Sequence, residues 1–364
     1  MFKGLVKGPA CCEQEMRAGL SQSERAVASK AAAFPNAQLH PDVEVRWHLG
    51  ETWGCPWQPH EVHGAEGVGT VAVLRSMTEK DRLSPVLLAC CGVVHETWVP
   101  TEWHRKLYHH HGCKNARALP EVVDSSVFRP KRFRAGPSGR KSPNDGRTLF
   151  LSVFQWQARK GPDALLQAYW QAFTKADAVV LRIRSRVPSW AGLPFSSTRE
   201  GVEHYAQQLH RKDAQQLAAV ETIEGDEMTR DGMSQLFRDA DAFVLPSRGE
   251  GWCLPCAEAM ASDTLLIASD FSGMTEFANT ANSLPVRCPV PLEGEGHCEP
   301  DVQGLAWRMR WAHEHPAEAA ALGRRGGEDI RQSFGVRAVA DTWRREAARA
   351  VKQHFSTGLE LHHR

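Results

Sequence analysis

Segments rich in apolar residues alternate with longer amphipathic segments along the second half of this chain. The apolar segments are of the kind that forms strands buried on both faces, and they cover residues 148–154, 178–184, 242–246 and 265–269. The longer segments favour helices, and the first of them begins at Pro162, a residue suited to a first helical turn. Strands and helices that alternate at this spacing predict an α/β fold with a doubly wound parallel sheet.

The first half shows this alternation less clearly. Residues 71–74, 85–91 and 97–100 are apolar enough for strands, and a helix is predicted from an N-cap at Thr101 to about His110. Residues 47–69 are rich in glycine, proline, histidine and tryptophan, which predicts a long loop. A length of 364 residues suits two domains. We expect a reduced Rossmann-like domain over 1–128, a linker over 129–147, a second domain over 148–335 and a last helix within 336–364.

The charge balance excludes some classes of partner. Basic and acidic residues nearly cancel, 44 against 43, whereas a general nucleic-acid or membrane-surface binder usually carries a clear excess. The chain has no run of 18 apolar residues, so we expect no transmembrane segment, and residues 1–17 do not resemble a secretory signal. The cations of 129–147 could suggest a polyanion site, but without aromatic residues among them a solvated linker is favoured.

Ten cysteines are scattered along the chain, two pairs of them adjacent in sequence. Without a secretion signal, this placement predicts reduced thiols and a cytoplasmic protein. Cys253 and Cys256 form the CxxC motif, which could serve a metal or a thiol redox reaction. A second ligand pair for zinc is missing from the sequence, so we expect no metal site.

Ligands of doubly wound sheets bind beyond the carboxyl ends of the strands, and this rule selects the loops 155–161, 185–197 and 247–254. In the last of these, Glu250 stands between two glycines and a helix is predicted to begin near Pro255. A helix start favours phosphate, and Gly251 allows the backbone to approach a ligand closely. Glu258, eight residues after Glu250, could accept hydroxyl groups from another part of the same ligand. Either glutamate alone could be an ordinary turn or helix residue, but the pair in this setting favours a sugar-nucleotide site.

The loop after 148–154 carries two cations just before the predicted helix. Lys160 could act as a point charge for a diphosphate, and Arg159 could bind it with two N–H groups. Cations are unfavourable at the amino end of a helix, so their presence there points to a ligand more than to an ordinary surface.

These elements resemble the family 4 retaining glycosyltransferases, the glycosyl transferases group 1, which have the GT-B fold of two Rossmann-like domains. The resemblance covers about residues 94–355. Its motifs are Glu250-Gly251-Trp252-x-Leu254-Pro255-x-x-Glu258-Ala259-Met260-Ala261, the approach strand 239–247, the following segment 269–276, Arg159-Lys160-Gly161, and the segments 98–103 and 120–130.

The resemblance implies a metal-independent hexosyl transfer from a nucleotide-diphosphate sugar with retention of configuration. It assigns catalytic roles to Lys160, on the diphosphate, and Glu250, on the transferred sugar. Glu258 is expected to hold the ribose, and Arg159, Gly251, Trp252 and Leu254 to line the donor. It implies no cofactor besides the donor, an acceptor that is a glycan, lipid or small molecule, and a last helix that returns to the first domain.

Some positions differ from the family pattern. Cys253 replaces a glycine, Asp263 and Leu265 replace a glycine and a proline, and the cation usual before Lys160 is absent. These differences keep open a second hypothesis, a catalytically silent GT-B-like protein that binds a nucleotide or a partner. A thiol-redox or zinc protein built on Cys253 and Cys256 is a third. Four histidines could serve as acceptor-site bases, although we favour structural roles for them: His48, His60, His63 and His95.

Overall fold

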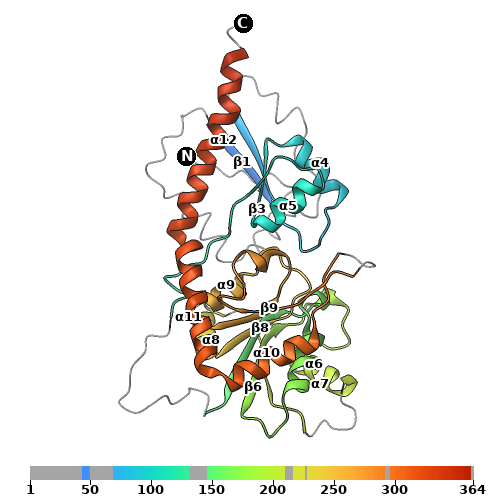
Figure 1. Ribbon diagram of the computed structural model, residues 1–364. Coiled ribbons are helices and arrows are strands. Elements are labelled where there is room, and N and C mark those ends of the chain that lie inside the picture. Colours follow the sequence, from blue (N-terminus) through green and yellow to red (C-terminus); the bar gives the residue numbers. More distant parts are fainter. Residues whose placement is uncertain are drawn as a thin grey trace, which may run out of the picture. The chain divides into compact units, whose positions relative to one another are not determined.

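A computed structural model describes residues 43–49, 69–130, 146–209, 216–225, 228–291 and 296–361, and these ranges form two compact units (Figure 1). Of the described residues, the first unit contains 43–49, 69–78, 82–122 and 336–361. The second unit contains the described residues of 123–335 together with the short segment Glu79–Asp81. In the described part of the chain, no helix is both long and apolar enough to cross a membrane.

The second unit is built on a six-stranded parallel sheet with the order β10-β9-β8-β5-β6-β7. Its strands are β5 (Thr148–Gln155), β6 (Val179–Arg186), β7 (Val220–Ile223), β8 (Ala242–Leu245), β9 (Leu265–Ser269) and β10 (Leu284–Val286). Beginning at β5, the chain first adds strands on one side, then returns to place β8 against the other side of β5. The strand order therefore reverses between β5 and β8, which is the point where open α/β sheets bind ligands.

Two groups of helices cover this sheet (Figure 1). The helix α6 (Pro162–Ala172) packs against α7 (Thr198–Leu209) and α10 (Val302–Glu314). The helix α9 (Leu254–Ala261) packs against α8 (Arg230–Asp239) and α11 (Pro316–Ser333). The strand residues between these groups are buried and join one large apolar core.

The first unit has a four-stranded parallel sheet with the order β1-β2-β3-β4. Its strands are β1 (Val43–Leu49), β2 (Gly69–Arg75), β3 (Glu96–Val99) and β4 (Ala116–Ala118). The helices α4 (Pro85–Val93) and α5 (Glu102–His110) pack with one set of apolar strand residues. The long helix α12 (Val336–Leu361) contributes Ala350 to a second cluster with Val71, Val73 and Trp98. The sheet thus buries residues on both faces.

Several predictions of secondary structure are confirmed and others are wrong. The strands near 71–74, 97–100, 148–154 and 242–246 are present, and Thr101 caps α5 by accepting a hydrogen bond from the His104 N–H. Residues 85–91, predicted as a strand, form α4, because Ser84 caps the helix and Pro85 fits its first turn. The strands β1, β7 and β10 were not predicted; each pairs with only one neighbour at a sheet edge.

The cysteines also correct an expectation. The prediction of reduced thiols is wrong for six of them, because the structure contains the disulfides Cys91–Cys113, Cys253–Cys256 and Cys288–Cys298. The second of these is the CxxC motif. Most of the loop predicted over 47–69 and of the linker predicted over 129–147 lies outside the described residues, as do His60 and His63.

Candidate functional site

The loops that follow β5 and β8 meet at the reversal point of the second unit's sheet. The β5 loop contains a short 3-10 helix, Ala158–Lys160, and ends at Gly161, whose φ is 68°. A Cβ atom on Gly161 would lie 2.1 Å from the carbonyl oxygen of Pro246, at the end of β8. Only glycine allows both this left-handed conformation and this approach, so Gly161 holds the Lys160 loop against the β8 loop.

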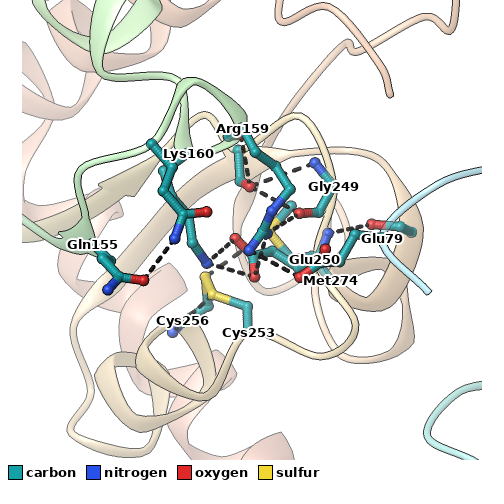
Figure 2. A network of polar contacts seen from close by, with 12 residues as sticks. Glu79, Gln155, Arg159, Lys160, Gly249, Glu250, Cys253, Cys256 and Met274 are labelled. Carbon is teal, nitrogen blue, oxygen red and sulfur yellow. Dashed lines mark hydrogen bonds and ion pairs between the residues drawn. A yellow bond between two sulfur atoms is a disulfide. The ribbon is translucent and has the colours of Figure 1, made fainter. Parts of the chain in front are cut away.

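Lys160 and Glu250 face each other across these two loops (Figure 2). The Nζ atom of Lys160 lies 2.6 Å from Oε1 and 2.8 Å from Oε2 of Glu250, a side chain that is almost fully buried. Burial by itself would raise the pKa of Glu250, but Lys160 and Arg159 outweigh it and lower the pKa below its usual value. Glu250 is therefore held as a carboxylate in a largely water-free position.

Arg159 contacts the same carboxylate and a second one (Figure 2). Its Nη1 atom lies 2.6 Å from the Gly249 carbonyl oxygen and 3.3 Å from Oε2 of Glu250. Its Nη2 atom lies 2.8 Å from Oε1 of Glu79. Two cations thus face two carboxylates, and their formal charges cancel before any ligand is considered.

Glu79 is a site residue that the sequence analysis missed. It lies between β2 and α4 in the chain but belongs to the compact unit that contains Arg159. Its backbone lies so close to the β8 loop that a Cβ atom on Gly249 would be 1.9 Å from the Glu79 carbonyl oxygen. Burial raises the pKa of the Glu79 carboxyl, more than Arg159 lowers it. No local sequence motif surrounds Glu79, so only the tertiary structure identifies it as a site residue.

The start of α9 contributes backbone N–H groups. Among the described residues, none accepts a hydrogen bond from the N–H of Gly251, Trp252 or Cys253. The carbonyl oxygen of the preceding residue, Glu250, is engaged, because it accepts a hydrogen bond from the Gly273 N–H at 2.9 Å. Unsatisfied N–H groups beside a helix start form a surface that suits an anion.

The side chains of Trp252 and Leu254 do not have the same role as these backbone groups. Trp252 is buried, with ring centroids 5.2 Å from both Phe277 and Phe334. Leu254 is half-buried and packs against the same core. Trp252, one of the predicted donor-lining residues, therefore contributes its backbone N–H to the candidate site. Its indole packs in the core and holds the loop in place.

Among the described residues, three other than glycine have left-handed backbone angles, and they lie just before α9, just after α9 and just after β9. They are Cys253, Asp263 and Ser272, with φ values of 75°, 62° and 55°. The first two are positions where the family pattern has glycine. Their positive φ values explain that preference, because glycine adopts such angles without a steric penalty. Asp263 is compensated by an ion pair with Arg331 at 2.7 Å, and Ser272 by accepting the Glu250 N–H at 2.9 Å. Cys253 is bonded to Cys256.

Glu258 lies in α9, apart from the Lys160–Glu250 pair. Its side chain is half-buried and makes no hydrogen bond with any described residue. Burial raises its pKa to about 8, although the positive charge of Arg230 acts in the opposite direction. A shielded carboxyl group without a partner is suited to bind hydroxyl groups of a ligand.

The candidate histidines of the first unit are less informative. The Nδ1 atom of His95 accepts a hydrogen bond from the Ala72 N–H at 3.0 Å, so this ring supports the sheet. The side chain of His48 is not described. Within the described ranges, no three histidine, cysteine, aspartate or glutamate side chains are grouped to hold a metal ion.

Comparisons with known proteins agree with this geometry. A family model described as "Glycosyl transferases group 1" matches residues 138–326. A D-inositol 3-phosphate glycosyltransferase from Nocardiopsis dassonvillei is 30% identical over 60% of this chain and 50% of its own length. A protein of the same name from Kineococcus radiotolerans is 25% identical over 96% of this chain and 79% of its own. The match to the first of these relatives thus spans about half of its length.

The solved structures show a shared fold. Sucrose-phosphate synthase from Thermosynechococcus elongatus superposes with a TM-score of 0.61 at 18% identity, covering 92% of this chain and 78% of that one. The α/β architecture with two parallel-sheet units is that of the GT-B glycosyltransferases.

Proposed function

Because the chain belongs to the glycosyl transferases group 1 family, we propose that it transfers a hexosyl group from a nucleoside-diphosphate sugar to an acceptor. The transfer would proceed with retention of configuration and without a bound metal. The observation that carries this proposal is the meeting of Lys160, Arg159 and Glu250 at the reversal point of the sheet, beside the open N–H groups at the start of α9.

The diphosphate is the part of the donor that these groups suit best. As the bond to the sugar breaks, negative charge grows on the leaving phosphate, and fixed cations stabilise that charge more in a shielded site than in water. Lys160 and Arg159 supply the cations, and the N–H groups of Gly251 and Trp252 supply neutral donors. Together, once Lys160 and Arg159 turn from the carboxylates to the diphosphate, they would stabilise the leaving group without a metal ion.

The two glutamates suit the two ends of the donor. Glu250, held as a carboxylate, can accept hydrogen bonds from hydroxyl groups of the transferred sugar once Lys160 turns to the phosphate. Glu258, whose carboxyl makes no hydrogen bond with the described residues, can accept the ribose hydroxyls. The first unit would supply the acceptor site, and the names of two relatives make D-inositol 3-phosphate the first acceptor to test.

A panel of UDP-, GDP- and ADP-linked hexoses tests the proposal. We expect at least one to raise the melting temperature of the protein and to be hydrolysed slowly, or transferred when an acceptor is added. The configuration of the product, read from its anomeric proton signal, and the rate in excess EDTA test retention and metal independence. The proposal is wrong if no donor stabilises the protein and Glu250→Ala changes no response.

A second candidate is a silent protein that binds a nucleotide sugar without transferring it. The neutralised charges of the site and the cysteine at a left-handed glycine position favour it. Stabilisation by a donor, with neither hydrolysis nor transfer in the wild type and in Cys253→Gly, would establish binding without turnover.

A further inference from the structure

The disulfide between Cys253 and Cys256 lies where the loop of residues 246–253, here called the donor loop, enters α9 (Figure 2). Cys253 is the N-cap residue of α9, and its Sγ atom accepts a hydrogen bond from the Cys256 N–H at 3.3 Å. Cys256 lies in the first turn, with Sγ 3.9 Å from Sδ of Met274. The bond therefore joins the residue before the helix to the helix, next to the open N–H groups of Gly251 and Trp252.

The two sulfur atoms are not equivalent. Cys256 is fully buried, whereas Cys253 retains 5% of its surface. Cys253 is thus the more accessible of two buried sulfurs, and the helix start favours Cys253 as the leaving thiolate when the mixed disulfide is resolved. Glu250, whose carboxylate Lys160 binds, lies three residues earlier in the same loop.

The backbone of Cys253 connects this bond to the donor loop. At a φ of 75°, a residue with a Cβ atom is unfavourable by about 1–2 kcal/mol relative to glycine. The crosslink to Cys256 holds Cys253 in this conformation, which is the one a glycine would adopt freely. Without the crosslink, Cys253 can relax to a negative φ, and the peptide group between Trp252 and Cys253 then changes its orientation.

We propose that Cys253–Cys256 is a thiol–disulfide exchange site for a dithiol reductant, and that its oxidised form keeps the donor loop competent to bind. This inference rests on the proposed function, since it concerns the same loop. It also gives the cysteine at the glycine position a role, because the disulfide replaces the conformational freedom that glycine would supply.

The exchange balances as a two-electron reduction. A thiolate of the dithiol attacks Sγ of Cys253, the protein S–S bond breaks, and Cys256 leaves as a thiolate that takes up a proton. The second thiol of the reductant then attacks its own sulfur in the mixed disulfide and releases Cys253 as a thiol. The products are two protein thiols and the oxidised reductant.

Two variants represent the two states. Cys253→Gly adopts the left-handed angle without strain and cannot form the bond, so it should bind donor as the oxidised protein does, under all conditions. Cys256→Ala leaves Cys253 without a partner, so it should behave as the reduced protein. Any effect of reducing Cys91–Cys113 or Cys288–Cys298 would also be present in Cys253→Gly, which makes this variant the matched control.

The experiment measures the binding of UDP, GDP and ADP before and after treatment with dithiothreitol, with alkylation and peptide mass spectrometry to identify the bonded cysteines. We expect a single peptide that carries Cys253 and Cys256 as an internal disulfide and resists alkylation before reduction, and an affinity of the wild type that falls about tenfold on reduction. Cys253→Gly should change less than twofold, and Cys256→Ala should match the reduced wild type. Free, alkylatable Cys253 and Cys256 before reduction, or an unchanged wild-type affinity, overturns the inference.

Amide hydrogen exchange over residues 250–257 separates this inference from the proposed function. If no nucleotide binds in either state, the donor chemistry is wrong. Faster exchange on reduction of the wild type, but not of Cys253→Gly, still supports a redox-controlled loop, and equal exchange in both states overturns it.

Discussion

Lys160 donates to both carboxylate oxygens of Glu250, at 2.6 and 2.8 Å, although the two residues are separated by 90 positions in the chain. They meet because β5 and β8 are neighbours in the sheet and each residue lies in the loop that follows its strand. In the absence of donor, the charge proposed to stabilise the diphosphate is therefore directed at the carboxylate proposed to bind the sugar.

Replacement of Lys160 tests this pair. Lys160→Met leaves Glu250 buried with Arg159 as its remaining cation, so the free energy of unfolding should fall by about 2–3 kcal/mol. Lys160→Met combined with Glu250→Gln should cost less than the two single changes added together, with a coupling of about 1 kcal/mol or more. Urea unfolding of the four proteins measures the coupling, and strictly additive effects would show that the pair contributes nothing.

Glu79 should oppose donor binding, because it places a negative charge on the guanidinium proposed to bind phosphate. Glu79→Gln should strengthen the binding of a nucleoside diphosphate about fivefold. The reason is that one unit charge about 4 Å from another contributes roughly 1 kcal/mol in water-like surroundings. Since the pKa of Glu79 is raised, the wild type should approach the variant as the pH falls and the carboxylate is protonated. Isothermal titration at several pH values measures both effects.

Glu221→Gln is the matched control for this prediction. The exposed fraction of Glu221 is close to that of Glu79, 39% against 37%, and Glu221 pairs with Arg182 at 2.8 Å on the neighbouring strands β6 and β7. This change removes one carboxylate and leaves the network of Arg159 and Lys160 intact. Equal gains in affinity from both variants would contradict a specific role of Glu79.

Glu258 should make the protein less stable as the pH rises from about 4.5 to about 8. Its folded-state pKa of about 8 lies above the ordinary value of 4.5, so its contribution is fully present below about pH 4.5 and is lost as the pH rises through 8. Glu258→Gln does not ionise, so at pH 9 it should be more stable than the wild type by about 2 kcal/mol, a value reduced for partial exposure. Denaturant unfolding at pH 5 and pH 9 checks this, and a difference that is the same at both values would refute it.

Gly327 should be required for the packing of α11 against α9. A Cβ atom there would lie 2.1 Å from Oδ1 of Asp263 and 2.8 Å from the Met260 carbonyl oxygen. Gly327→Ala should therefore lower the free energy of unfolding by about 2–4 kcal/mol and weaken donor binding through the displaced α9. Gly92→Ala is the control, because Gly92 is exposed in α4 with no atom within 4 Å of the added Cβ, and it should be neutral or slightly stabilising. Thermal unfolding of both variants compares them.

Sequence patterns predicted the second unit better than the first. The strands β5, β6, β8 and β9 are buried on both faces, so their apolar composition identifies them locally. The segment 85–91 is equally apolar, but composition does not separate a short buried strand from a buried helix. Ser84 caps this segment and Pro85 fits a first helical turn, so the segment forms a helix. These two residues were the local signal that distinguishes the helix from a strand.

The sequence by itself determined the chemistry of the loops: Lys160, Arg159, Glu250 and Glu258 stand at strand ends or helix starts that local patterns identify. Only the tertiary structure decided which of these groups touch, because the order of strands in a parallel sheet results from long-range packing and not from any local pattern. The same packing placed Glu79 on Arg159 and set Cys253 in a left-handed conformation closed by Cys256. The Glu79–Arg159 contact depends on a close approach between backbone segments that are distant in the chain. The conformation of Cys253 depends on a backbone torsion angle. Residue identities alone specify neither.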